Sequence, residues 1–171
     1  MGNGGSNNRQ LWHGTPYLID LDDAMRRRLY ARPSNVLGGE SAVFAATERR
    51  LALLFAMPNN FTTNLTETGY FGPKNGSERD MTFYVGERKP GVFKRLNGQK
   101  KRYSGYIYHI DAEDAVDFHT DSRLGMPTRE KICDHSVKVD QVEFIEDVWE
   151  AIRRDDTIVK MTYEDVQKTF K

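Results

Sequence analysis

The sequence predicts an α+β domain built on an antiparallel-rich sheet, and three observations indicate this class. Strand and helix patterns follow one another in the order strand–helix, several strands, then strand–helix. No internal repeat or linker-like composition interrupts residues 10–171. The chain has 171 residues, which is the length of one domain. We therefore expect a single domain over residues 10–171, preceded by a short leader.

The leader, residues 1–9 (MGNGGSNNR), offers almost nothing to a core, so we expect it to be disordered. It also matches the N-myristoylation pattern, with Gly2 after the initiator and Ser6 at the required place. A flexible tail or a cloning remnant explains the same residues. If Gly2 is acylated, one chain gives only weak membrane association, which Arg26–Arg28 would strengthen at anionic lipid.

The first predicted strand covers residues 11–16 (LWHGTP). Side chains alternate along a strand, so His13 points away from Trp12 and to the same side as Leu11. Gly14 lacks a Cβ and lets a ligand approach the backbone, and Pro16 ends the extended run. An imidazole beside an open N–H would hold an amide or a ribose hydroxyl. A strand end with a half-buried histidine and a turn glycine is the alternative interpretation.

Residues 17–32 have the spacing of a helix, with Leu18, Leu21, Met25 and Leu29 on one face. Pro33 stops this helix, and residues 34–40 form a loop whose two adjacent glycines could shape a pocket wall. The sequence then predicts a strand at residues 42–46 and a helix at residues 48–57, with Thr47 as its N-cap. The buried face of that helix is predicted to contain Leu51, Leu54 and Phe55.

Residues 58–80 are rich in Asn, Thr, Gly and Pro and predict a long surface loop, which Tyr70 and Phe71 would pin down. Three strands should follow, at residues 81–85, 91–96 and 104–110. Asn97-Gly98 is a turn signal, so we expect the second and third of these strands to pair.

Seven basic residues and no acidic one lie between Arg88 and Arg102, with aromatic residues among and beside them. Such a segment is typical of a nucleic-acid or phosphate surface. We favour a solvated hairpin, whose lysines prevent edge pairing, because the overall charge of the chain is balanced. Nucleic acid therefore stays a partner that the sequence allows but does not favour.

The last third begins with an acidic connection over residues 111–128. A strand is predicted over residues 129–139, and an amphipathic helix is predicted from the spacing of Val142, Ile145, Val148, Trp149 and Ile152. Residues 157–161 form a final strand. Thr162 caps a last helix through Phe170, with Asp165 completing a capping box.

Composition limits the function classes. Lys and Arg total 25, as do Asp and Glu, so net charge indicates no particular partner. Cys133 is the single cysteine, which excludes a disulfide scaffold and favours a reducing, cytoplasmic compartment. Four histidines and one cysteine without close pairing argue against a zinc site, so we expect no metal. No stretch of the sequence is apolar enough to cross a membrane.

Several motifs together resemble the ADP-ribosyltransferase superfamily, in its poly(ADP-ribose) polymerase and diphtheria-toxin branch. They are His13-Gly14-Thr15 ending a first strand, then residues 42–46 and the helix with residues 51–55 about thirty residues later. The strand at residues 105–108 and Glu130, ahead of Cys133 and Val137, are similar to small relatives of that fold. RNA 2′-phosphotransferases share the fold and often begin with a similar His-Gly-Thr. The resemblance covers residues 10–161 and implies a split sheet with a few flanking helices.

The resemblance also implies a site that uses NAD as substrate. His13 matches the histidine that binds the nicotinamide-side ribose, the Gly14 backbone holds the carboxamide, and Thr15 completes this NAD-binding motif. Phe44 stands where the family usually has a tyrosine; it can stack on nicotinamide but lacks the hydroxyl. Glu130 matches the catalytic glutamate, which stabilises the positive charge that develops as the glycosidic bond breaks. The alternative is that Glu130 is a surface carboxylate beside Arg129 and Lys131.

Two functions from different classes follow. The first is an NAD-dependent ADP-ribosyl transferase or NAD glycohydrolase, whose acceptor the sequence does not name. The second is a catalytically silent module of the same fold that binds nucleotide, ADP-ribose or nucleic acid, which the missing tyrosine favours. A phosphotransferase would require a set of arginines around a phosphate, and spacing alone does not place such a set.

Overall fold

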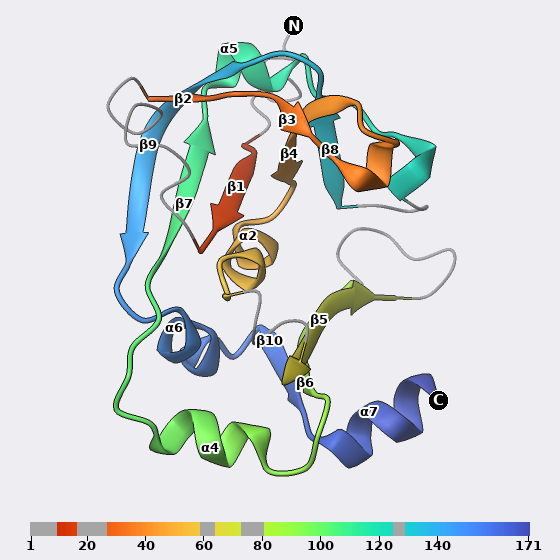
Figure 1. Cartoon of the computed structure of the whole chain (residues 1–171), viewed down its shortest axis with the longest axis vertical. Helices are drawn as coiled ribbons and strands as arrows, with labels where there is room; N and C mark the ends of the chain where they lie inside the picture. The colour runs from red at the N-terminus through yellow and green to blue at the C-terminus, as the bar shows by residue number, and fades with distance from the viewer. Residues whose placement is uncertain (1–9, 17–26, 59–63, 73–80, 125–128) are drawn as a thin grey trace, which may run out of the picture.

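The main sheet has seven strands in the computed structural model, which describes residues 10–16, 27–58, 64–72, 81–124 and 129–171. The strands are β1 (Trp12–Thr15), β2 (Arg28–Leu29), β3 (Arg32–Pro33), β4 (Ser41–Ala46), β7 (Gly105–Ile110), β8 (Glu130–Cys133) and β9 (Val137–Ile145). Their order is β2-β9-β7-β1-β4-β3, and β8 also pairs with β4. All of these pairs are antiparallel, and the sheet curls in Figure 1.

A second, smaller sheet lies below the first in Figure 1. It contains β5 (Thr66–Phe71), β6 (Thr82–Glu87) and β10 (Ile158–Met161), in the order β10-β6-β5. The β5–β6 pair is antiparallel, whereas β10 and β6 are parallel. The described helices are α2 (Arg49–Phe55), α4 (Val92–Gly98), α5 (Ala112–Ala115), α6 (Val148–Arg154) and α7 (Tyr163–Phe170), with 3₁₀ turns η2 (Asn35–Leu37) and η4 (Ser122–Leu124).

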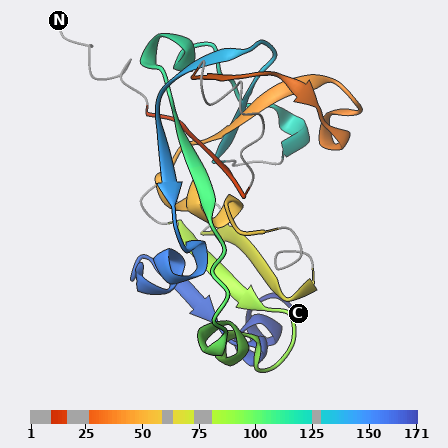
Figure 2. The same cartoon turned by 60° about the vertical axis from the view of Figure 1, so that its left-hand side comes forward.

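Helix α2 lies between the two sheets, as both Figure 1 and Figure 2 show. Its buried residues Leu51 and Leu54 belong to a core that also contains Phe83 of β6 and Ile152 of α6. A second core lies on the opposite face of the main sheet and contains Leu11, Val43 and Tyr108, among others. Apolar side chains on alternate positions of β1, β4 and β7 thus fill two separate cores.

The main sheet opens between β1 and β4. Residue pairing between these strands is registered at one position, Trp12 opposite Ala46. Beyond that position the two strands separate, whereas β1 stays paired with β7 along its whole length. The α+β class and the antiparallel sheet are therefore confirmed, and the gap between β1 and β4 is the feature that positions the site.

Most of the predicted elements are present. The strands predicted from residues 11, 42, 81, 104 and 157 correspond to β1, β4, β6, β7 and β10, and the helix predicted after residue 47 is α2. The capping box of the last helix is also confirmed: Thr162 accepts the Asp165 N–H, and the Asp165 carboxylate accepts the Thr162 N–H. None of the described helices is long and apolar enough to cross a membrane.

The helix predicted over residues 17–32 is wrong where the structure describes it. Arg28 and Leu29 form β2, paired with β9, and Leu29 is buried in the second core. Pairing with a distant strand outweighs the local helical spacing here. Leu18, Leu21 and Met25 lie outside the described residues, as do the leader and Gly2.

The strand predicted over residues 91–96 is a helix, α4, so the predicted hairpin is wrong too. Val92 and Leu96 are buried and four residues apart, which is helical spacing. Gly91 precedes the helix with a φ of 83°, and the buried Glu87 carboxylate accepts the Phe93 N–H at 2.8 Å. A residue outside the helix therefore satisfies one of its first donors.

Three further boundaries differ. The loop predicted over residues 58–80 contains β5, which is paired with β6 from Thr66 to Phe71. The strand predicted over residues 129–139 is two strands, β8 and β9, and β9 continues through Ile145, so α6 begins only at Val148. The N-cap of α2 is Glu48 rather than Thr47, and the Glu48 side chain makes no capping hydrogen bond.

Candidate functional site

A cavity of about 200 Å³ lies where β1 and β4 separate. Its walls come from three strands and one helix that are far apart in the sequence. The lining residues are Trp12, His13, Gly14, Phe44, Ala45, Ala46, Phe55 and Glu130. The structure therefore brings His13, Gly14, Phe44 and Glu130 together around one cavity.

His13 spans the gap between β1 and β4. Its Nδ1 lies 2.7 Å from the carbonyl oxygen of Phe44, and a carbonyl can only accept, so Nδ1 carries the proton and donates. Nε2 of the neutral ring is then an acceptor. It is buried and has no hydrogen-bond partner among the described residues. Burial lowers the pKa of His13, which keeps this acceptor available at neutral pH.

The backbone of Gly14 faces the gap. The Ile110 N–H donates to the Leu11 carbonyl, which makes these two residues a hydrogen-bonded pair of the β1–β7 ladder. Hydrogen-bonding direction alternates along an antiparallel strand, so Trp12 and Gly14 turn their N–H and C=O toward β4. Trp12 meets Ala46 there, whereas Gly14 lies beyond the registered β1–β4 pairing of the described chain. A donor and an acceptor are thus presented side by side to the cavity.

The structure gives a second reason for a glycine at position 14, which the sequence did not show. A Cβ placed on Gly14 would lie 1.8 Å from the carbonyl oxygen of Ala52. The backbone of α2 therefore packs directly on β1 at this residue. Glycine at this position therefore permits the close contact with α2 and also leaves the backbone of β1 accessible from the cavity.

Two phenyl rings line the cavity, Phe44 from β4 and Phe55 from the end of α2. Phe44 was expected at the site, whereas Phe55 was predicted on the core face of its helix. The structure leaves Phe55 38% exposed, so that prediction is wrong. Because Leu54, Ala56 and Met57 around it are all buried, no local sequence signal marks Phe55 as a cavity residue.

Glu130 is the first residue of β8 and lies opposite Ala46 of β4. Cross-strand partners share a face, so Glu130 lies on the same side of the sheet as Trp12 and Ala46. It is only half-buried, yet burial raises the pKa of its carboxyl group. Glu130 is thus a partly exposed residue that contributes to the cavity wall.

Thr15 is placed differently from the other residues of its motif. It is 7% exposed and is not part of the cavity wall. Its backbone pairs with Tyr106 of β7. Thr15 therefore supports β1 from inside the sheet.

A second cavity of about 220 Å³ shares His13 and Phe44 with the first. Its other lining residues are Leu29, Tyr30, Arg32, Pro33, Ser34, Ala42 and Val43. Both cavities are smaller than a pocket that buries a whole drug-sized ligand, about 300–1,000 Å³. Together they offer two compartments on either side of one shared wall.

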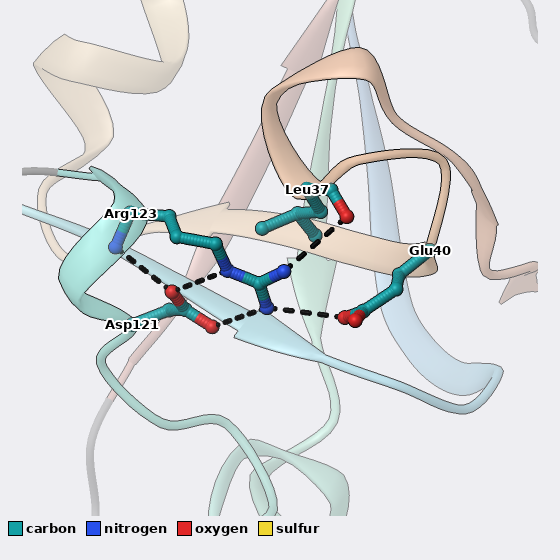
Figure 3. A network of polar contacts seen from close by, with 4 residues as sticks. All are labelled: Leu37, Glu40, Asp121 and Arg123. Atoms are coloured by element: carbon teal, nitrogen blue, oxygen red, sulfur yellow. Dashed lines mark hydrogen bonds and ion pairs between the residues drawn. The ribbon is translucent and has the colours of Figure 1, made fainter.

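Arg123 holds the turn that contains Leu37 and Glu40, as Figure 3 shows. Arg123 of η4 donates to the Leu37 carbonyl at 3.2 Å and to the Glu40 carboxylate at 3.1 Å. It also pairs with Asp121 at 2.8 Å, and this hydrogen bonding holds the pKa of Asp121 far below its usual range. The predicted loop at residues 34–40, with Gly38 and Gly39 at positive φ, is thereby fixed to η4.

One group of described residues has the composition of a metal site. Cys133, Asp134 and His135 place a sulfur, a carboxylate oxygen and a ring nitrogen within 4.8 Å of one another. Burial raises the pKa of the Cys133 thiol, which opposes the thiolate that a metal requires. His135 is already engaged with Asp117 at 3.1 Å.

Comparisons with protein-family models, curated proteins and solved structures gave no match.

Proposed function

We propose that the cavity between β1 and β4 binds the nicotinamide half of NAD, and that the protein is an NAD glycohydrolase or ADP-ribosyl transferase. The observation that carries this proposal is the convergence of His13, Gly14, Phe44 and Glu130 on one cavity. These residues lie on three strands, and the resemblance to the ADP-ribosyltransferase superfamily named each of them independently of their positions in space.

Each group has a chemical counterpart in a nicotinamide riboside. The N–H and C=O of Gly14 match the carbonyl and amino groups of a carboxamide. The aromatic rings of Phe44 and Phe55 provide apolar faces on which the cationic nicotinamide ring can stack. His13 Nε2, a buried acceptor, matches a ribose hydroxyl. The second cavity, which shares His13 and Phe44, gives the rest of the dinucleotide a place to extend, with Arg32 near its phosphates.

Glu130 supplies the charge that the reaction needs. When the bond from the ribose C1′ to the nicotinamide nitrogen breaks, its electron pair leaves with nicotinamide and C1′ becomes cationic. A carboxylate fixed beside that carbon stabilises the transition state more than the ground state. Attack by water then forms the C1′–O bond, and the water proton is released, which yields ADP-ribose and nicotinamide. A nucleophilic side chain in place of water gives the transferase reaction.

A silent nucleotide-binding module is the second candidate, and a specific observation favours it. The raised pKa of Glu130 favours the neutral carboxyl group, which does not stabilise a cation. Phe44 also lacks the hydroxyl of the tyrosine that the resemblance leads one to expect. Both features leave binding intact and weaken turnover.

Two substitutions test the proposal. His13→Ala should weaken NAD binding measured by calorimetry by about 1–3 kcal/mol, because a buried polar partner is lost. Glu130→Gln should leave binding nearly unchanged and lower nicotinamide release by on the order of a hundredfold or more. His135→Ala, at an exposed histidine that does not line the cavity, is the matched control for the first variant.

The outcomes separate the candidates. Unchanged NAD affinity in a folded His13→Ala protein would remove the site. NAD binding that depends on His13, without release of nicotinamide by the wild type, assigns the protein to the silent module. A thermal melt of each variant shows whether the fold survives the substitution.

A further inference from the structure

The residue before Glu130 is held from both sides. The Thr47 N–H donates to the Arg129 carbonyl at 2.8 Å, and the Arg129 N–H donates to the hydroxyl oxygen of Tyr70 at 2.8 Å. Thr47 follows β4 directly, whereas Tyr70 belongs to β5 in the second sheet. Two parts of the molecule that are distant in sequence therefore hold the backbone of Arg129, one through its N–H and the other through its C=O.

Tyr70 is itself firmly placed. Its backbone pairs with Phe83 in the β5–β6 ladder, and the centroids of their rings lie 5.6 Å apart. Phe83 is fully buried, and the guanidinium of Arg50, a residue of α2, lies 4.0 Å from the centroid of the Phe83 ring. The hydroxyl of Tyr70 is thus delivered to Arg129 from a packed support.

These contacts restrict the position of Glu130. This residue opens β8, so its ladder with β4 constrains the strand in the direction of Cys133 and the Arg129 contacts constrain it from the other end. Arg129 is 6% exposed, so water does not readily replace the Tyr70 hydroxyl as acceptor for its N–H. Loss of that acceptor would release the N–H side of Arg129 and favour movement of this residue, whose carbonyl carbon is bonded to Glu130.

We propose that Tyr70 is a positioning residue, which sets the place of the Glu130 carboxylate through the Arg129 N–H. This inference rests on the proposed function, because it gives Glu130 a position worth fixing. Catalytic groups lose on the order of a hundredfold in rate when they are misplaced by about 1 Å. The second sheet thereby takes part in the reaction without touching the cavity.

Tyr70→Phe tests the proposal, because it removes the acceptor and keeps the ring. The rate constant kcat for nicotinamide release should fall about tenfold or more, with KM for NAD changed less than about twofold. Tyr84→Phe is the matched control: Tyr84 lies in the same sheet, and its hydroxyl donates to Glu67 at 3.3 Å, remote from Glu130. An equal effect of the two variants, or parallel changes in kcat and KM, would show a merely structural role for Tyr70.

A second measurement separates this proposal from the proposed function. In protein carrying ¹³C-labelled glutamate, the Glu130 carboxyl signal is the one that Glu130→Gln removes. Its titration reports the surroundings of the carboxylate whether or not the wild type releases nicotinamide. Tyr70→Phe should shift the pKa of Glu130 back toward the ordinary glutamate range, as the group moves toward solvent, and Tyr84→Phe should not. An unchanged titration in Tyr70→Phe would overturn the positioning role.

Discussion

Burial moves the pKa values of His13 and Glu130 in opposite directions, and both shifts favour a neutral cavity. The pKa of His13 is lowered and that of Glu130 is raised. An apolar site next to a cationic ligand uses both effects: the neutral histidine does not repel the ligand, and the ligand's charge restores the ionised glutamate. The site is therefore set for a ligand that brings its own positive charge.

Nicotinamide release should increase with pH, and the rising limb of kcat/KM should lie above the ordinary titration range of glutamate. The reason is that kcat/KM reports the free protein, in which burial raises the pKa of Glu130. The rising limb of kcat should lie at lower pH, because the bound cationic ring favours the carboxylate. Steady-state rates over about pH 4–8 measure both limbs.

The stability of the protein gives the matched check on this pH dependence. A raised pKa in the folded state means that Glu130 keeps its proton longer when folded than when unfolded. The free energy of unfolding contributed by this group therefore falls as pH rises from the ordinary glutamate pKa to the raised one, and stays lower above it. Glu130→Gln should melt at a higher temperature than wild type at neutral pH, and Glu67→Gln should not. In the kinetic experiment, a rising limb of kcat/KM at the ordinary glutamate pKa would contradict the raised pKa of Glu130.

Four residues that the sequence singled out, His13, Gly14, Phe44 and Glu130, lie around one cavity. His13 and Gly14 sit on a short strand whose alternation sets their direction, and Glu130 heads a strand. Phe55 was missed because helical spacing groups it with the buried Leu51 and Leu54, whereas its side chain borders the cavity. Tyr70 was missed as a contact of Arg129 because no local signal links residues 59 positions apart.

At the scale of elements, the contact between α2 and β1 decides how the cavity is built. The Ala52 carbonyl occupies the space where a side chain on Gly14 would begin. This close contact brings the end of α2, with Phe55, to the cavity wall beside β1. A larger residue at position 14 would move the helix and the aromatic wall together.

Gly14→Ala should therefore destabilise the protein by about 1–3 kcal/mol or more, because its Cβ meets backbone that cannot rotate away. Gly98→Ala is the control: Gly98 lies in α4, and a Cβ there meets nothing within 4 Å. That variant should be neutral or stabilised by up to about 1 kcal/mol, since glycine is unfavourable in helices. Denaturant unfolding measures both. Equal stabilities of Gly14→Ala and wild type would contradict the close packing of α2 on β1.

The strands that the sequence missed share one physical cause, which is pairing with a distant strand. Residues 28–29 and 66–71 are strands because β9 and β6 lie beside them. Val142 and Ile145 have helical spacing with Val148 but belong to β9, whose partner is β7. The opposite error at α4 arose because Val92, Phe93 and Leu96 fit a short strand as well as one helical turn. Elements with their own caps, such as α7, were predicted correctly.

At the scale of the whole molecule, the basic segment 88–102 lies away from the cavity. The basic segment 88–102 runs through α4, at the end of the molecule opposite β1, β4 and β8 in Figure 1 and Figure 2. Some of its cations already have protein partners: Arg102 pairs with Glu146, Arg88 donates to the Thr66 carbonyl at 2.8 Å, and Lys101 lies over the Tyr103 ring. The hairpin expected for this segment is a helix, yet the preference against a nucleic-acid surface is unaffected.

We expect weak binding of RNA and DNA by this segment at physiological salt. Each phosphate neutralised by a cation adds to the salt dependence, and seven such contacts would make affinity fall steeply with added salt. Three of the seven cations, Arg88, Lys101 and Arg102, already have protein partners, and none of the seven lines the cavity beside Glu130. Fluorescence polarisation with a short RNA and a short DNA over a series of salt concentrations measures the affinity and its slope. Replacing the exposed Lys94 and Lys100 by Gln should change the affinity for RNA and DNA little, because we expect this surface to bind nucleic acid only weakly. Submicromolar binding that weakens steeply with salt, and that is lost in this double variant, would instead assign the α4 end of the molecule to nucleic acid.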